Sequence, residues 1–170
     1  MKKILTSLLI ISALAASSQP DKSKRPSPPA VVTETLENGT TIIIDYSRPS
    51  VKGRTIGEDL EPYPGKVWRT GANEATVFET DKDIKVQGQP LPAGKYGLFS
   101  IANGGEWTII FNKTWKQWGT QYNEADDFLR VSAKAGKAAE FTEQMTFTIN
   151  KDGKISLLWG DIDVSFMVEK

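Results

Sequence analysis

The sequence contains neither cysteine nor histidine in its 170 residues. Without cysteine the protein has no disulfides, no thiol nucleophile and no thiol for a lipid anchor, so we expect it not to be a lipoprotein. Without histidine it has no Ser-His-Asp triad, and the two absences together remove the usual ligands of zinc, copper and haem. Catalysis would have to use carboxylates, Lys, Arg, Tyr, Ser or Thr. Nothing in the sequence predicts a cofactor or a metal site.

The chain also lacks an excess of charge of either sign. Lysine and arginine number 21, as do aspartate and glutamate, so the formal net charge is zero. Because binding to a phosphate backbone requires a basic surface, we expect no nucleic-acid partner. A hydrophobic content of 39% with 25% charged residues is typical of a globular domain and not of a disordered chain.

Long hydrophobic runs are nearly absent as well. One stands at Ile4–Leu14, where it follows Lys2 and Lys3 and precedes small residues. This pattern predicts a secretory signal peptide over residues 1–18, cleaved after Ala15 or before Gln19. No later segment is long and apolar enough for a membrane span. We therefore expect an exported protein, periplasmic or secreted, with no membrane span once the signal has been removed.

Residues 19–30 follow the signal peptide and contain four prolines among charged residues and serines. This composition predicts an extended tether. Its basic cluster, Lys22, Lys24 and Arg25, is interpreted as solvated. Residues 31–170 are then expected to form one folded domain, since their length suits one domain and is short for two.

Within residues 31–170 the sequence predicts short β-strands joined by turns. Asn38-Gly39 predicts a hairpin with a type I′ turn, and glycine-containing turns at residues 103–105 and 151–153 predict two more hairpins. For residues 134–141 a short helix and a wide loop both remain open. The result is an all-β, single-domain antiparallel β-sandwich or jelly-roll-like fold of nine or ten short strands. The expected strands are 31–37, 40–47, 75–80, 84–86, 95–101, 106–112, 128–133, 144–149, 154–159 and 162–168.

One polar stretch stands out, Val67–Thr76, with the sequence V-W-R-T-G-A-N-E-A-T, which we call the signature block. With Arg48 and Arg54 from the preceding loop, its Arg69 offers guanidinium groups that match a carboxylate, phosphate or sulfate. Asn73 and Glu74 would add further polar contacts. The alternative is a structural network in which Arg69 pairs with Glu74 or Asp45 and ties the loop to the sheet.

A second candidate set is aromatic. Trp115, Trp118 and Tyr122 lie in a polar loop between two expected strands. Aromatic rings at the end of a sandwich can stack on the faces of sugars. The alternative is that these rings fold back and cover the open end of the domain, since exposed tryptophans are rare unless they bind something.

The signature block and the run D-Y-S-R-P-S-V-K-G-R at residues 45–54 resemble a bacterial family, the exported domain of unknown function family 2911 (DUF 2911). The run L-P-A-G-K-Y at residues 91–96, the pair Trp118-Gly119 with Tyr122, and L-R-V at residues 129–131 match its pattern too. The resemblance covers nearly everything after the tether. It implies export in Gram-negative bacteria and a β-rich domain, and it implies no activity.

Three functions remain open. The favoured one is a binding module for a small polar or anionic ligand or a glycan, contacted by Arg48, Arg54, Arg69, Asn73 and Glu74, with Trp115, Trp118 and Tyr122 as an aromatic wall. The second is a hydrolase of sugars or esters that uses Glu74 with Asp45 or Asp161; it needs two facing carboxylates, one with a raised pKa. The third is a structural or interaction module of the cell envelope, in which every arginine would be buried against a carboxylate.

Overall fold

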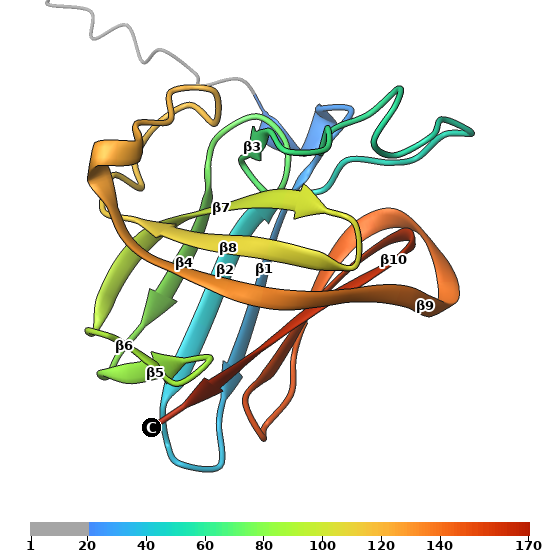
Figure 1. Cartoon of the computed structure of the whole chain (residues 1–170). Coiled ribbons are helices and arrows are strands. Elements are labelled where there is room, and N and C mark those ends of the chain that lie inside the picture. The colour runs from blue at the N-terminus through green and yellow to red at the C-terminus, as the bar shows by residue number, and fades with distance from the viewer. Residues whose placement is uncertain (1–20) are drawn as a thin grey trace, which may run out of the picture.

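The computed structural model describes residues 21–170, so the expected signal peptide at residues 1–18 lies outside the described residues. The described part contains ten β-strands, two short 3₁₀ turns and no α-helix (Figure 1), which confirms the all-β prediction. The strands are β1 (Pro29–Thr35), β2 (Thr41–Ser47), β3 (Val67–Trp68), β4 (Thr76–Thr80), β5 (Ile84–Val86), β6 (Gln89–Leu91), β7 (Gly94–Asn103), β8 (Glu106–Asn112), β9 (Asp127–Ile149) and β10 (Lys154–Glu169); the 3₁₀ turns are η1 (Lys22–Lys24) and η2 (Glu124–Asp126).

The strands form one antiparallel sheet with the order β1-β2-β4-β7-β8-β9-β10-β5-β6, and β3 pairs with β7 beside this path. The sheet curls over itself, so that β1, β2 and β4 form a back layer while β7, β8 and β9 cross in front (Figure 1). Consecutive strands are mostly neighbours, as short hairpin connections require. The expected single antiparallel domain is confirmed, and its two layers belong to the same sheet.

The chain just after β2 fastens the back layer to the end of β9. Ser50 forms an isolated antiparallel bridge with Gln144. On either side of it, the Val51 N–H donates to the Glu143 carbonyl and the Met145 N–H donates to the Pro49 carbonyl, both at 2.9 Å. We call these contacts the closure. They connect two parts of the sheet that are far apart in the strand order.

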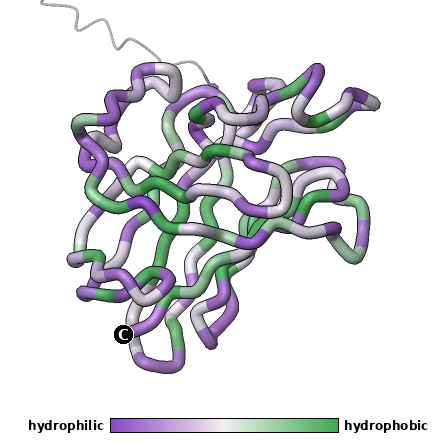
Figure 2. The backbone as a smooth tube through the Cα atoms, viewed as in Figure 1, coloured by the Kyte–Doolittle hydropathy of each residue, from purple (hydrophilic) through white to green (hydrophobic). Residues whose placement is uncertain are grey.

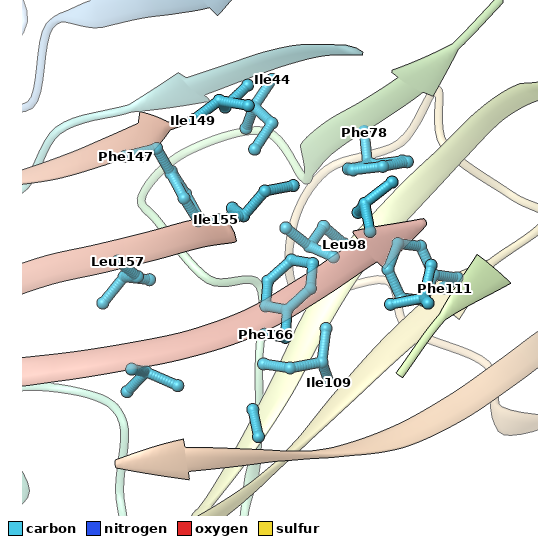
Figure 3. Close-up of a cluster of buried hydrophobic side chains, with 14 of the residues drawn as sticks. Ile44, Phe78, Leu98, Ile109, Phe111, Phe147, Ile149, Ile155, Leu157 and Phe166 are labelled. Atoms are coloured by element: carbon cyan, nitrogen blue, oxygen red, sulfur yellow. The ribbon is translucent and has the colours of Figure 1, made fainter. Parts of the chain in front are cut away.

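The core lies between the two layers and is built from alternate residues of the strands. In β2, Ile42, Ile44 and Tyr46 point inward and are buried, as their shared face predicts. Figure 2 shows hydrophobic positions concentrated on the strands that cross the middle of the molecule. Full burial of one such side chain contributes roughly 1.5–3 kcal/mol. Residues from both layers meet in Figure 3, among them Ile44, Phe78, Leu98, Ile109, Phe111, Phe147, Ile149, Ile155, Leu157 and Phe166.

Residues 134–141 form neither the short helix nor the wide loop expected, because β9 continues through them as strand. Five of the eight residues are Ala or Lys, which favour helix. Strand pairing overrides that preference: Lys134 pairs with Glu106 of β8, and residues 134–137 pair with β10. Likewise residues 154–159 and 162–168 are one strand, β10, with a bulge at Gly160, whose φ is +58°.

The turn at Asn38-Gly39 joins β1 and β2 as predicted, but the type I′ assignment was wrong. Only Gly39 has a positive φ, +78°, and its N–H donates to the Leu36 carbonyl, so the turn spans Leu36–Gly39. Two consecutive positive φ angles, as a type I′ turn requires, occur at Lys52 (+49°) and Gly53 (+69°) and at Gln87 (+49°) and Gly88 (+77°), the second pair between β5 and β6.

Candidate functional site

The signature block is anchored in the core by its tryptophan. Trp68 is 2% exposed. Its ring stacks on Trp159 of β10 with centroids 5.7 Å apart and meets Trp107 of β8 edge-on at 6.4 Å. Such aromatic pairs add about 0.5–1.5 kcal/mol beyond the area they bury. The start of the block is therefore fixed to β8 and β10.

After Trp68 the block makes a tight loop. Thr70 and Asn73 both have positive φ, +51° and +62°. This conformation is unusual for a β-branched residue such as threonine. Buried hydrogen bonds hold it: the Thr70 hydroxyl donates to the Ser100 hydroxyl, and the Thr76 hydroxyl donates to the Thr70 carbonyl, both at 2.9 Å. A Cβ at Gly71 would lie 2.8 Å from that Thr76 hydroxyl oxygen, so the loop needs glycine there.

The three arginines of the predicted anion site do not meet in one place. Arg48 donates to the Met145 carbonyl at 2.9 Å and to the Thr146 hydroxyl at 2.6 Å, which reinforces the closure. Arg54 donates to the Val51 and Ser50 carbonyls of its own loop. Of the three, only Arg54 and Arg69 line a common cavity.

Arg69 pairs with Glu61 rather than with Glu74 or Asp45. Its Nη2 lies 2.9 Å from the Glu61 carboxylate, and the Arg69 side chain is 19% exposed. A structural ion pair of Arg69 was expected with Glu74 or Asp45. Such a pair exists, but its acid is Glu61. Sequence reasoning missed Glu61, because nothing distinguishes it from the other acids of the long loop. The buried Nε of Arg69 has no hydrogen-bond partner within residues 21–170.

Glu74 binds the tether. Lys22 Nζ lies 3.0 Å and Arg25 Nη1 2.8 Å from its carboxylate oxygens, while Asn73 donates to the Ser27 carbonyl at 3.0 Å. Lys22 and Arg25 are therefore docked on the domain, and not the solvated cluster expected. Burial by itself raises the pKa of Glu74, but the hydrogen bonds from Lys22 and Arg25 outweigh it and lower the pKa to about 2. Glu74 is a carboxylate at neutral pH.

The aromatic loop, residues 113–126, is tied to the signature block by its backbone. The Ala75 N–H donates to the Gln117 carbonyl at 3.1 Å, and the Gly119 N–H donates to the Asn73 carbonyl at 3.0 Å. A Cβ at Gly119 would overlap the Arg69 side chain, so only glycine allows this approach. The block thus joins the tether on one side to the aromatic loop on the other.

The three aromatic residues of this loop divide into one covered and two exposed rings. Tyr122 packs on Phe99 at 4.9 Å and donates to Asp127 at 2.6 Å. Burial first, and then this hydrogen bond, raise the pKa of Tyr122 to about 12. Tyr122 therefore covers the outer face of β7, as the alternative interpretation holds, whereas Trp115 and Trp118 stay 36% and 47% exposed. Lys95 Nζ lies 5.4 Å from the Trp115 ring centroid.

Two cavities flank the signature block. The first, which we call the Asp45 groove, has a volume of about 190 Å³; Trp115, Asp45 and Glu74 line it together with Lys22, Lys116 and Gln117. Burial raises the pKa of Asp45, the neighbouring Glu74 adds to this, and Lys22 opposes it. The second, which we call the Arg69 pocket, has a similar volume and is lined by Arg54, Glu61, Arg69 and Trp159 among others.

Within residues 21–170 no group of three or more acidic side chains gathers as metal ligands would. No helix in that part of the chain has the length and hydropathy needed to cross a membrane. Asp161, the alternative partner proposed for Glu74, lines a different cavity beside Phe141 and Gly160 and not the Asp45 groove. The groove instead brings together Asp45 and Glu74, the other carboxylate pair expected for a hydrolase.

Glu74→Gln is expected to release the tether and to speed trypsin cleavage after Lys22 and Lys24 severalfold. The same release is expected in the wild type at acid pH. Because the pKa of Glu74 in the folded protein, about 2, lies below the ordinary 4.5, docking is fully stabilising above about pH 4.5 and is lost as the pH falls toward 2. Time-resolved mass spectrometry of the digest at neutral pH measures the first effect.

The matched control is Glu79→Gln, which removes a carboxylate 3.0 Å from Lys95 with similar exposure, 34% against 38% for Glu74. Its digestion should match the wild type. Equal cleavage rates in the two variants would show that Glu74 does not hold the tether.

A protein-family model described as "Protein of unknown function (DUF2911)" matches residues 27–168. The match spans the domain from the end of the tether to Val168 and confirms the resemblance drawn from the signature block. No curated protein and no solved structure matches the chain.

Proposed function

The chain belongs to the DUF2911 family of proteins of unknown function, and from its own side chains we propose that it is a non-catalytic module that binds a neutral sugar unit in the Asp45 groove. One observation carries the proposal: the Trp115 ring, more than a third exposed, lines the same groove as two carboxylates and an amide. The sequence pattern of a signal peptide supports the further proposal that binding takes place outside the cytoplasm.

The groove supplies the two kinds of contact that a sugar needs. An exposed indole face can stack on the apolar C–H face of a pyranose ring. Around it, the carboxylates of Asp45 and Glu74 accept hydrogen bonds from hydroxyl groups, and the Gln117 amide both donates and accepts. A few polar groups placed around an apolar surface are typical of small-molecule sites.

Charge and size favour a neutral, small ligand. Asp45 and Glu74 are balanced by Lys22 and Lys116 along the lining, so the groove has no excess charge to attract an anion. Its volume of about 190 Å³ is below the roughly 300–1,000 Å³ of pockets that hold drug-sized ligands. One sugar ring is therefore the unit we expect it to take.

Calorimetric titration with glucose, galactose, mannose, N-acetylglucosamine and their disaccharides tests the proposal. Trp115→Ala should weaken binding of the sugar that the wild type binds about tenfold or more, which corresponds to about 1.4 kcal/mol. Trp118→Ala is the matched control, because Trp118 is at least as exposed but does not line the groove. Absence of binding to every sugar, or equal affinity in the Trp115→Ala variant, would refute the proposal.

The second candidate is glycoside hydrolysis. It is favoured by the pKa shifts of two carboxyl groups in one groove: the pKa of Asp45 is raised and that of Glu74 is lowered. Glycosidases use such a pair, one carboxyl group as the proton donor and the other as a charged carboxylate. Against it, Lys22 and Arg25 each pair with one oxygen of the Glu74 carboxylate, which neutralises the charge that a nucleophile or base would use while leaving each oxygen a lone pair for a hydrogen bond. Hydrolysis predicts release of reducing sugar from the disaccharides by the wild type and none by Asp45→Asn. The proposed binding module releases none in either case.

A further inference from the structure

The Arg69 pocket lies against a different part of the signature block from the Asp45 groove. Arg69, Gly71 and Ala72 line the pocket, whereas Glu74 and Ala75 line the groove. Within residues 21–170 the two cavities share no lining residue. The pocket is therefore a separate site from the Asp45 groove.

Two buried N–H donors belong to residues that line this pocket, and neither has a partner in the described part of the chain. They are Nε of Arg69 and Nε1 of Trp159, whose side chain is only 2% exposed. A buried donor without an acceptor is destabilising, and folded proteins rarely leave one unpaired. Both donors belong to residues that line one small cavity, so a group rich in acceptors bound there is a candidate partner for both.

The charges around the pocket also favour an acceptor with negative charge. Arg54 and Arg69 contribute two positive charges and Glu61 one negative charge. The Glu61 carboxylate is already engaged by Arg69. Arg54 donates to backbone carbonyls and forms no salt bridge within residues 21–170. The lining is thus left with one uncompensated positive charge and an excess of donors.

We propose that the Arg69 pocket binds the carboxylate group of a small organic acid, with Arg69 Nε and Trp159 Nε1 as its donors. A carboxylate carries the single negative charge that the lining lacks. Its two oxygens offer an acceptor to each of the two donors, and guanidinium groups are suited to this partner. The volume of about 190 Å³ admits a group of this size.

The indole N–H of Trp159 gives a direct readout by ¹H–¹⁵N correlation spectroscopy, in which the five tryptophans give five indole signals. Trp159→Phe assigns the signal of Trp159. Titration with sodium acetate at constant ionic strength, balanced with sodium chloride, should move this signal downfield and saturate. The indole signal of Trp107, which is also buried and packs against Trp68, is the internal control and should not move.

Arg69→Lys keeps the positive charge but removes Nε, and it should abolish the saturable shift. Arg130→Lys, in an exposed network with Asp127 and Glu124, is the matched control and should shift as the wild type does. Dispersion of the remaining indole signals reports that each variant is folded. A Trp159 signal that acetate and sodium phosphate leave unchanged would overturn the proposal, and a response to phosphate alone would overturn the assignment to a carboxylate.

Trp115→Ala separates this site from the sugar site. The variant removes the stacking ring of the Asp45 groove and leaves every residue of the Arg69 pocket in place. It should therefore respond to acetate as the wild type does, whether or not the groove binds sugars. An acetate response lost in Trp115→Ala would show that the pocket does not act as a separate site.

Discussion

Trp68→Ala is expected to lower the free energy of unfolding by about 3–5 kcal/mol, the range measured for buried aromatic residues replaced by alanine. Trp68 is 2% exposed and contacts both Trp159 and Trp107. Its removal leaves a cavity where the signature block enters the core, and it ends two aromatic contacts at once. Equilibrium unfolding in urea, followed by far-UV circular dichroism, measures the loss.

Trp118→Ala is the control for this prediction. Trp118 has the same side chain but is 47% exposed, so its replacement should change the free energy of unfolding by about 0.5 kcal/mol or less. The comparison separates the burial of the ring from the loss of an aromatic residue as such. Similar losses in both variants would contradict the placement of Trp68 in the core.

Gly153→Ala is expected to destabilise the protein by about 2–5 kcal/mol. Gly153 closes the turn between β9 and β10 with φ of +93°, a conformation that costs other residues roughly 1–2 kcal/mol. In addition, a Cβ there would overlap the backbone carbonyl oxygen of Val168. Because backbone cannot move aside as a side chain can, we add about 1–3 kcal/mol for overpacking. Thermal and urea unfolding both measure the sum.

Gly88→Ala isolates the contribution of the backbone conformation. Gly88 has a similar φ, +77°, in the turn between β5 and β6, but a Cβ there has no heavy atom within 4 Å. Its replacement should therefore cost only the strain, about 1–2 kcal/mol. If Gly153→Ala were no more destabilising than Gly88→Ala, the close approach of Val168 to the turn would be refuted.

Most strands were predictable because their residues alternate between core and surface. Ile42, Ile44 and Tyr46 are buried on one face of β2, and Val164, Phe166 and Val168 on one face of β10. This period of two is a local property, so the sequence alone shows it. The glycines in the turns marked where one strand of a hairpin ends and the next begins.

The middle of β9 was not predictable in the same way. Its Ala- and Lys-rich residues 134–141 include several exposed positions and lack the buried alternation of the other strands. Their first half is held as strand because β10 pairs with residues 134–137 and β8 pairs with Lys134. The neighbours decide the conformation here, and they are distant in the sequence.

For the candidate site, the sequence drew attention to the signature block but did not predict which side chains its charged residues pair with. The signature block does organise the loops at one end of the domain, yet Arg69 pairs with Glu61 and Glu74 with Lys22 and Arg25. The pairing of acidic with basic side chains depends on how the loops fold over the sheet. No sequence pattern distinguishes the charged residue of a loop that will form an ion pair from the others. Asp45 was expected as a carboxylate partner of Glu74, whereas no pattern in the sequence pointed to Trp159 as a residue that lines a pocket.

In the aromatic loop, each of the two interpretations holds for some of the residues: Tyr122 covers the domain, whereas Trp115 stays exposed. Tyr122 is fixed against Phe99 by its ring and to Asp127 by its hydroxyl. Trp115, seven residues earlier in the same loop, keeps an exposed ring in the Asp45 groove. Composition gives no means of telling these roles apart, since both depend on which face of β7 and β8 lies beneath the loop.

The closure between Ser50 and Gln144 has a consequence for how the chain folds. The two residues are 94 positions apart (144 − 50), and strands β3 to β8 with most of β9 lie between them in sequence. Bringing such distant segments together loses chain entropy before the contacts form, and chains dominated by remote pairings fold in milliseconds to seconds rather than microseconds. We therefore expect the domain to fold slowly, with its two layers joined at this point late in the process.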